Sequence, residues 1–123
     1  MRLNVIKKII LLLSFVFTNQ IIAQCKEFEE KNFDFLLNSE SKIELIFFSS
    51  WCSDCKDDLL KLSKEQKILK NKIVIINTFD RIENANKALK ALNVDFDCYF
   101  DKNRVLTKKY NIKTVPSHIY INN

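Results

Sequence analysis

Two cysteines separated by two residues are the part of this sequence best suited to chemistry. Cys52 and Cys55 have the spacing that lets two sulfurs close one small disulfide. An unbroken apolar run at 45–48 precedes the pair, and a mixed polar and apolar pattern at 56–62 follows it. These patterns predict a buried strand and then an amphipathic helix. We therefore expect the pair at the start of a helix, where unpaired N–H groups and the helix dipole stabilise a thiolate.

The same pattern predicts different surroundings for the two sulfurs. Cys55 begins an apolar stripe that continues at helical spacing with Leu59, Leu62 and Leu69, so its side chain should face the core. Cys52 precedes Cys55 by one helical turn and should lie outermost, at the surface. An exposed thiolate beside a shielded partner thiol is the arrangement that thiol–disulfide exchange requires.

Residues 1–23 have the pattern of a secretory signal peptide. A basic start is followed by an apolar stretch at 9–17 and a short segment that ends at Ala23. The stretch is too short to span a membrane comfortably, so we expect cleavage near Ala23 and export to the periplasm or another extracytoplasmic space. Lipid attachment at Cys25 is less favoured, because Gln24 occupies the position where a small residue is expected.

Without this segment the chain is close to neutral. The whole sequence carries 20 basic and 15 acidic residues, and the first 23 residues hold three of the basic ones and no acidic one. Residues 24–123 therefore contain 17 basic and 15 acidic residues. This balance gives no reason to expect a nucleic-acid partner, and the length fits one domain with a modest core.

Residues 24–123 show alternating helix and strand patterns. Strands are predicted at 43–48, 73–76, 96–100 and 117–121, and helices at 26–37, 52–70, 83–92 and 105–110. A short strand at 33–37 competes with the first helix. Strands that alternate with helices pair in parallel, so the sequence predicts an α/β domain with a layered sheet and flanking helices.

The only proline of the sequence lies directly before the last predicted strand. Pro116 would fix the backbone there and remove one hydrogen-bond donor. Taken alone, it would be an ordinary residue at a strand entry.

Two segments together resemble the thioredoxin superfamily, and most closely its exported bacterial thiol–disulfide oxidoreductases, which include reductases of cytochrome maturation. They are Phe47-Phe48-Ser49-Ser50-Trp51-Cys52-Ser53-Asp54-Cys55 and Tyr110-Asn111-Ile112-Lys113-Thr114-Val115-Pro116-Ser117. The element order of residues 43–121 follows the same family. The resemblance implies a thioredoxin-like fold for residues 24–123.

The resemblance also implies roles for single residues. Cys52 would attack a protein disulfide and Cys55 would resolve the mixed disulfide. Trp51 would flank the site, and Pro116 would be a cis-proline that faces the disulfide. The backbone of Val115 would then pair with the substrate strand, a form of edge addition.

The sequence departs from the family pattern near the cysteines. Asp54 stands where many members have proline, and a carboxylate beside Cys52 disfavours the thiolate, which favours the reductase direction. Ile46 occupies the strand position where thioredoxin has a buried acid. Asp58 matches the acid that the exported branch often places three residues after the second cysteine, so it is a candidate proton acceptor. An acid at a helix start without any function is the simpler interpretation.

The family continues past the last strand with a turn, another strand and a closing helix. This sequence stops at Asn123. We therefore expect the domain to be incomplete at its C-terminus, without the final strand and helix, and to leave residues 117–121 as an unprotected edge strand.

The remaining cysteines and the single histidine admit several interpretations. Cys25 and Cys98 could form a structural disulfide, but the sequence favours a small buried residue at Cys98 and a mobile terminal thiol at Cys25. His118 is interpreted as a surface residue of an alternating strand. One Cys-x-x-Cys with scattered further ligands does not make a zinc site, so we expect no metal.

The resemblance implies a protein-disulfide oxidoreductase that needs no cofactor beyond the Cys52–Cys55 disulfide. Its partners would be a protein disulfide substrate and a redox donor or acceptor protein, for which a membrane protein is one candidate. The alternative from another class is a redox-inert thioredoxin-like domain that only binds partners, or an inactive fragment.

Overall fold

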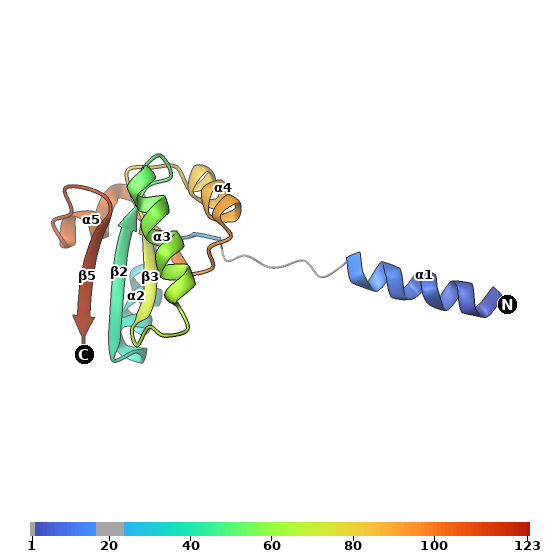
Figure 1. The fold of residues 1–123 in the computed structure, drawn as a ribbon. Helices are drawn as coiled ribbons and strands as arrows, with labels where there is room; N and C mark the ends of the chain where they lie inside the picture. Colours follow the sequence, from blue (N-terminus) through green and yellow to red (C-terminus); the bar gives the residue numbers. More distant parts are fainter. Residues whose placement is uncertain (1, 17–23) are drawn as a thin grey trace.

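The computed structural model describes residues 2–16 and 24–123, and residues 24–123 contain a five-stranded sheet (Figure 1). The strands are β1 (Lys26–Glu27), β2 (Lys42–Phe48), β3 (Lys72–Asn77), β4 (Asp97–Phe100) and β5 (Ser117–Asn122). Their order across the sheet is β1-β4-β3-β2-β5, with β5 antiparallel to β2 and all other neighbours parallel. The predicted α/β fold with a layered sheet is confirmed.

Helices connect the strands. They are α1 (Arg2–Val16), α2 (Glu30–Ser39), α3 (Ser53–Glu65), α4 (Ile82–Leu92) and α5 (Val105–Lys109), with a 3₁₀ turn, η1 (Lys102–Arg104), before α5. The apolar face of α3 and that of α4 pack on one face of the sheet, while α2 and α5 supply buried residues to the other.

The central strands are apolar on both faces because both faces are covered. Successive side chains of a strand point to opposite faces. In β2, Ile46 and Phe48 therefore pack under α3, whereas Leu45 and Phe47 pack with the cluster that contains Phe33 of α2. This double coverage explains the unbroken apolar runs of β2 and β3.

The predicted helices at 52–70 and 26–37 are shorter in the structure. α3 ends at Glu65, and α2 begins only at Glu30, because residues 26–27 form the short strand β1 beside β4. The alternative strand at 33–37 is wrong. Phe33 lies inside α2, and its ring packs edge-on against the rings of Phe28 and Tyr99, with centroids 5.3 and 6.0 Å away.

The predicted signal peptide overlaps the described residues only in part. Residues 2–16 form α1, and the predicted cleavage region at 17–23 lies outside the described residues. Among the helices that the structure describes, none combines the length and apolarity needed to span a bilayer. Signal cleavage stays a prediction.

Candidate active site

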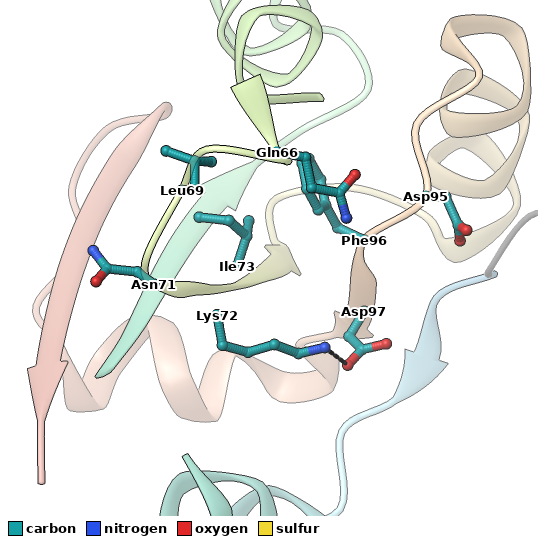
Figure 2. A pocket seen from close by; sticks show the side chains of 8 residues that line it. All are labelled: Gln66, Leu69, Asn71, Lys72, Ile73, Asp95, Phe96 and Asp97. Atoms are coloured by element: carbon teal, nitrogen blue, oxygen red, sulfur yellow. Dashed lines mark ion pairs between the residues drawn. The ribbon is translucent and has the colours of Figure 1, made fainter. Parts of the chain in front are cut away.

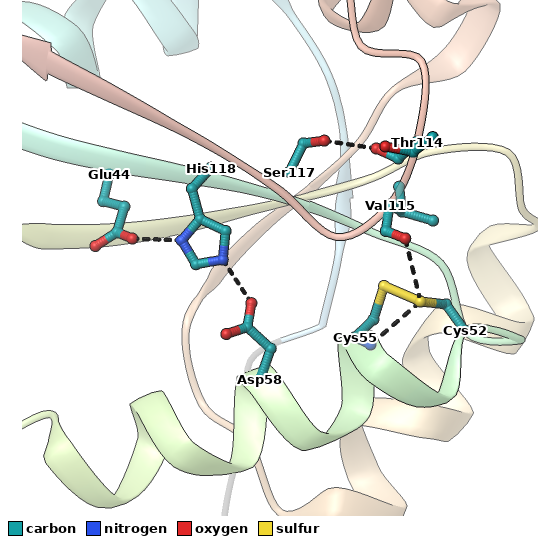
Figure 3. Close-up of polar contacts among 8 residues, drawn as sticks. All are labelled: Glu44, Cys52, Cys55, Asp58, Thr114, Val115, Ser117 and His118. Carbon is teal, nitrogen blue, oxygen red and sulfur yellow. Dashed lines mark hydrogen bonds and ion pairs between the residues drawn. A yellow bond between two sulfur atoms is a disulfide. The ribbon is translucent and has the colours of Figure 1, made fainter.

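Cys52 and Cys55 form a disulfide at the N-terminus of α3 (Figure 3). Cys52 is the N-cap residue, and its Sγ accepts a hydrogen bond from the backbone N–H of Cys55 at 3.1 Å. The backbone N–H of Lys56 donates to the carbonyl oxygen of Cys52 at 3.3 Å. Once the disulfide is opened, the Cys55 N–H and the helix dipole would stabilise a thiolate on Cys52.

The two cysteines differ less in exposure than the sequence predicted. Cys55 faces the core and is 1% exposed, as expected. Cys52 is only 7% exposed, so the prediction of a surface position is wrong. The loop before β5 covers it, and the carbonyl oxygen of Val115 lies 3.7 Å from the Cys52 sulfur.

Val115 and Pro116 come to the cysteines from a distant part of the sequence. The peptide bond between them is cis. The Val115 side chain packs against the core clusters on both faces of the sheet, and β5 begins directly after Pro116, at Ser117. The packing of this loop places the Val115 carbonyl beside the disulfide.

Trp51 stands beside the disulfide at the surface. Its side chain is 65% exposed, and its Nε1–H donates to the carbonyl oxygen of Phe79 at 2.9 Å. Asp80 supports the same loop, because it accepts hydrogen bonds from the backbone N–H and the hydroxyl of Ser50. Burial raises the pKa of Asp80, but hydrogen bonds from Asn77, Ser50 and the Arg81 backbone outweigh it, so the pKa is lowered overall.

Three ionisable side chains contact one another in a row near the disulfide. His118 of β5 stands between two carboxylates, with Nδ1 2.6 Å from Oε1 of Glu44 and Nε2 2.6 Å from Oδ2 of Asp58. The interpretation of His118 as a plain surface residue is therefore wrong, whereas the role of Asp58 as a proton acceptor stays a prediction. Antiparallel pairing of β5 with β2 turns the ring toward α3.

Of these three contacting side chains, Glu44 is the one that the sequence analysis missed. It is 5% exposed, in a strand whose remaining residues from 43 onward are apolar. The sequence does indicate such a contact, because a charged residue inside a buried strand needs a partner. The position at which thioredoxin carries its buried acid is Ile46 here, two residues further along β2 and on the same face as Glu44.

The two carboxylates control the protonation of His118. Burial of the ring lowers its pKa, but hydrogen bonds to Glu44 and Asp58 and the negative charges of both groups raise it by more. The net result is a pKa above the ordinary value of 6.5. Within residues 2–16 and 24–123, no His, Cys, Asp and Glu side chains gather in a group that could hold a metal ion.

Cys25 and Cys98 form a second disulfide, so the preferred interpretation of two unpaired residues is wrong. The parallel pairing of β1 with β4 sets Lys26 opposite Tyr99, which brings the two preceding cysteines together. Both are buried, and the backbone N–H of Cys25 also donates to Oδ1 of Asn86 at 2.8 Å. The burial of both sulfur-bearing residues marks this disulfide as a structural one.

A pocket of about 210 Å³ lies where β3 and β4 begin (Figure 2). The Cys52–Cys55 disulfide lies at the other end of the sheet, after the end of β2. The lining of the pocket comes from the end of α3 and the beginnings of β3 and β4: Gln66, Leu69, Asn71, Lys72, Ile73, Asp95, Phe96 and Asp97. Lys72 and Asp97 pair there, with Nζ 3.0 Å from Oδ2. The pocket is separate from the site around Cys52.

Comparison with known proteins gives one family and a group of related folds. The model of the AhpC/TSA family matches residues 17–123. No match was found among curated proteins.

Several solved structures share the fold. StoA from Bacillus subtilis is 26% identical, with a TM-score of 0.60 over 68% of this chain and 66% of that one. A secreted Mycobacterium tuberculosis disulfide oxidoreductase homologous to E. coli DsbE is 20% identical, with a TM-score of 0.58 over 68% and 69% of the two chains. A putative thiol:disulfide interchange protein DsbE from Chlorobium tepidum is 22% identical, with a TM-score of 0.59 over 71% and 64%. This chain therefore spans about two thirds of the length of these structures.

Proposed function

The chain belongs to the AhpC/TSA family, within the thioredoxin superfamily, and on that premise we propose that it is a protein-disulfide oxidoreductase. Its redox centre is the Cys52–Cys55 disulfide, and no further cofactor takes part. The observation that carries the proposal is the position of Cys52, which caps α3 with its sulfur facing both the Cys55 N–H and the Val115 carbonyl.

The first step in the reductase direction starts from the two free thiols. Cys52 loses its proton to solvent, and its thiolate attacks one sulfur of a substrate disulfide. The substrate S–S bond breaks, and the other substrate sulfur leaves as a thiolate that takes up a proton. Trp51 flanks the incoming segment, and the backbone of Val115, ahead of Pro116, pairs with it by edge addition.

The second step closes the enzyme disulfide. Cys55 gives its thiol proton to the carboxylate of Asp58, and the Cys55 thiolate attacks the Cys52 sulfur. The bond between Cys52 and the substrate breaks, and the second substrate sulfur leaves and is protonated. Two electrons have then moved from the enzyme dithiol to the substrate. Residues three apart on a helix have Cβ atoms about 5–6 Å apart, which places Asp58 within reach of Cys55.

The reductase direction is favoured because Asp54 lies two residues from Cys52 and its negative charge opposes the thiolate. A reductase needs a donor protein that reduces Cys52–Cys55 after each turnover, and a membrane protein could supply the electrons.

An extracytoplasmic location is supported by several features. Residues 1–23 have a signal pattern, the structure contains the Cys25–Cys98 disulfide, and one structural neighbour is a secreted protein. Structural disulfides persist in oxidising compartments. The Cys25 sulfur lies in that disulfide, which leaves no thiol for lipid attachment.

Reduction of insulin by dithiothreitol tests the activity. The protein should accelerate the precipitation of the released insulin chain, and Cys52→Ser should abolish the acceleration. Cys55→Ser should accumulate a mixed disulfide with insulin, because the resolving thiol is missing. A folded wild-type protein that leaves the rate unchanged would contradict the proposal and favour a redox-inert, partner-binding domain.

A further inference from the structure

A carboxylate–imidazole–carboxylate chain connects the sheet to the helix of the redox centre (Figure 3). Glu44 lies on β2, His118 on β5 and Asp58 on α3, one helical turn beyond Cys55. Both contacts of the ring measure 2.6 Å. One imidazole from β5 therefore contacts two consecutive elements, β2 and α3, that precede it by 60 residues or more.

The burial of Glu44 explains why it pairs with His118. A carboxylate that is 5% exposed is costly unless it is paired and hydrogen-bonded. In the β2–β5 register, His118 lies opposite Ile46 and Tyr120 opposite Glu44, so both β5 side chains share the face of Glu44. The His118 ring reaches Glu44 diagonally, and this bond fixes the ring in a single orientation.

The fixed ring in turn holds Asp58. Its Nε2 is hydrogen-bonded to Oδ2 of that carboxylate. Oδ1 is therefore the oxygen through which Asp58 can accept a proton. A protonated imidazole between two carboxylates also offsets their mutual repulsion. Without the ring, Glu44 and Asp58 would be like charges on one face of the sheet.

We propose that His118 and Glu44 are positioning residues that hold Asp58 beside Cys55 for the second thiol–disulfide step. This inference rests on the proposed function. The proton moves from Sγ of Cys55 to Oδ1 of Asp58, and neither His118 nor Glu44 gains or loses a proton in this step. Neither His118 nor Glu44 touches the reacting sulfurs.

Ellman's reagent separates the two steps of exchange. The Cys52 thiolate of the reduced protein attacks the reagent and releases one thionitrobenzoate, and Cys55 then displaces the second from Cys52. Stopped-flow absorbance therefore shows two phases, the second of which reports on Cys55. A total release of two equivalents verifies that Cys25–Cys98 stayed oxidised.

The proposal predicts a selective effect on the second phase. A positioned base contributes on the order of 10²-fold, so D58N should slow the second phase by about that factor and H118L by about tenfold. The first phase should keep its rate in both variants. H118Q should recover most of the loss, because the glutamine amide can donate to Asp58 from the position of Nε2. I119V, on the same strand but packed on the opposite face of the sheet, is the matched control and should behave as wild type.

The outcomes separate the inference from the function on which it rests. A second phase in H118L as fast as in wild type would overturn the positioning role. If H118L does not fold, E44L carries the test, because leucine leaves Nδ1 of His118 without an acceptor: a slower second phase with an unchanged first phase supports the role, and two unchanged phases overturn it. A wild-type protein that never releases the second thionitrobenzoate would instead contradict the proposed function.

Discussion

His118 shows how two acidic neighbours change the chemistry of one residue. Its side chain keeps contact with solvent on one side and with Glu44 and Asp58 on the others. The attraction of both carboxylates for a proton exceeds the cost of burying the ring, so its pKa is raised. The folded protein therefore binds a proton at His118 more tightly than the unfolded chain does.

This linkage predicts a pH-dependent contribution to stability. A group whose pKa is raised on folding stabilises the fold fully below its ordinary pKa, here 6.5, and the stabilisation is lost as the pH rises through the folded pKa. H118Q should lower the free energy of unfolding of the oxidised protein by about 1.5–3 kcal/mol at acidic pH, as expected for hydrogen bonds to charged groups. The difference should shrink steadily above the ordinary pKa.

Urea unfolding of both proteins at a series of pH values measures this difference. A gap between wild type and H118Q that does not change between acidic and alkaline pH would contradict the assigned protonation of His118.

The sequence identifies the redox pair but not the residues that support it. Cys52 and Cys55 are found because their chemistry depends on a local spacing and a local helix start. The contacts of His118 depend on register, because β5 must pair with β2 before the ring can meet Glu44, 74 residues earlier. A local pattern carries no information on that register, so His118 was interpreted as an ordinary strand residue.

At the scale of elements, the Cys25–Cys98 disulfide fixes the first strand to the sheet. β1 has only two residues, and its one neighbour is β4. Two residues of backbone pairing hold a strand weakly, whereas the disulfide closes a loop across a sequence separation of 73. The cross-link therefore supplies most of what keeps β1 in place.

Removal of this disulfide should be costly for stability and harmless for chemistry. The chain entropy of a loop of this length predicts that C25A/C98A lowers the free energy of unfolding by about 4 kcal/mol. Removal of a native disulfide from a small secreted domain typically costs about 2–5 kcal/mol. Insulin reduction at a temperature where the variant is folded should be retained, because Cys52 and Cys55 are unchanged. A loss below about 1 kcal/mol in urea unfolding would show that the disulfide does not stabilise the fold.

The sequence predicted β2, β3 and α4 well, but it did not predict β1 or the end of α3. The apolar runs of β2 and β3 and the periodic pattern of α4 predicted these elements to within one residue at either end. A strand of two residues, such as β1, has no periodicity that a pattern could reveal. The early end of α3 was missed for a related reason, because Ile68 and Leu69 continue the apolar pattern past the last helical residue, Glu65.

At the scale of the whole molecule, the redox site and the pocket lie at opposite ends of the sheet. The disulfide, Trp51 and the Val115 loop lie where β2 and β3 end, and the pocket beside Lys72 and Asp97 lies where β3 and β4 begin.

The direction of electron flow is a property of the whole protein, because the fold itself allows both. Known dithiols of this kind span reduction potentials from about −270 to about −120 mV. The charge of Asp54 near Cys52 should place this protein in the lower half of that range. Equilibration with glutathione buffers of known potential measures it, and a value near the upper end would reverse the proposed direction.

The account depends most on the reactivity of Cys52 in the reduced, folded protein. The rate of its alkylation by iodoacetamide at neutral pH, followed by peptide mass spectrometry, measures that reactivity directly. We predict that Cys52 reacts several times faster than Cys55 and faster than the same cysteine in urea-unfolded protein, because helix N–H groups favour its thiolate. A Cys52 that reacts no faster when folded than when unfolded would contradict the central claim.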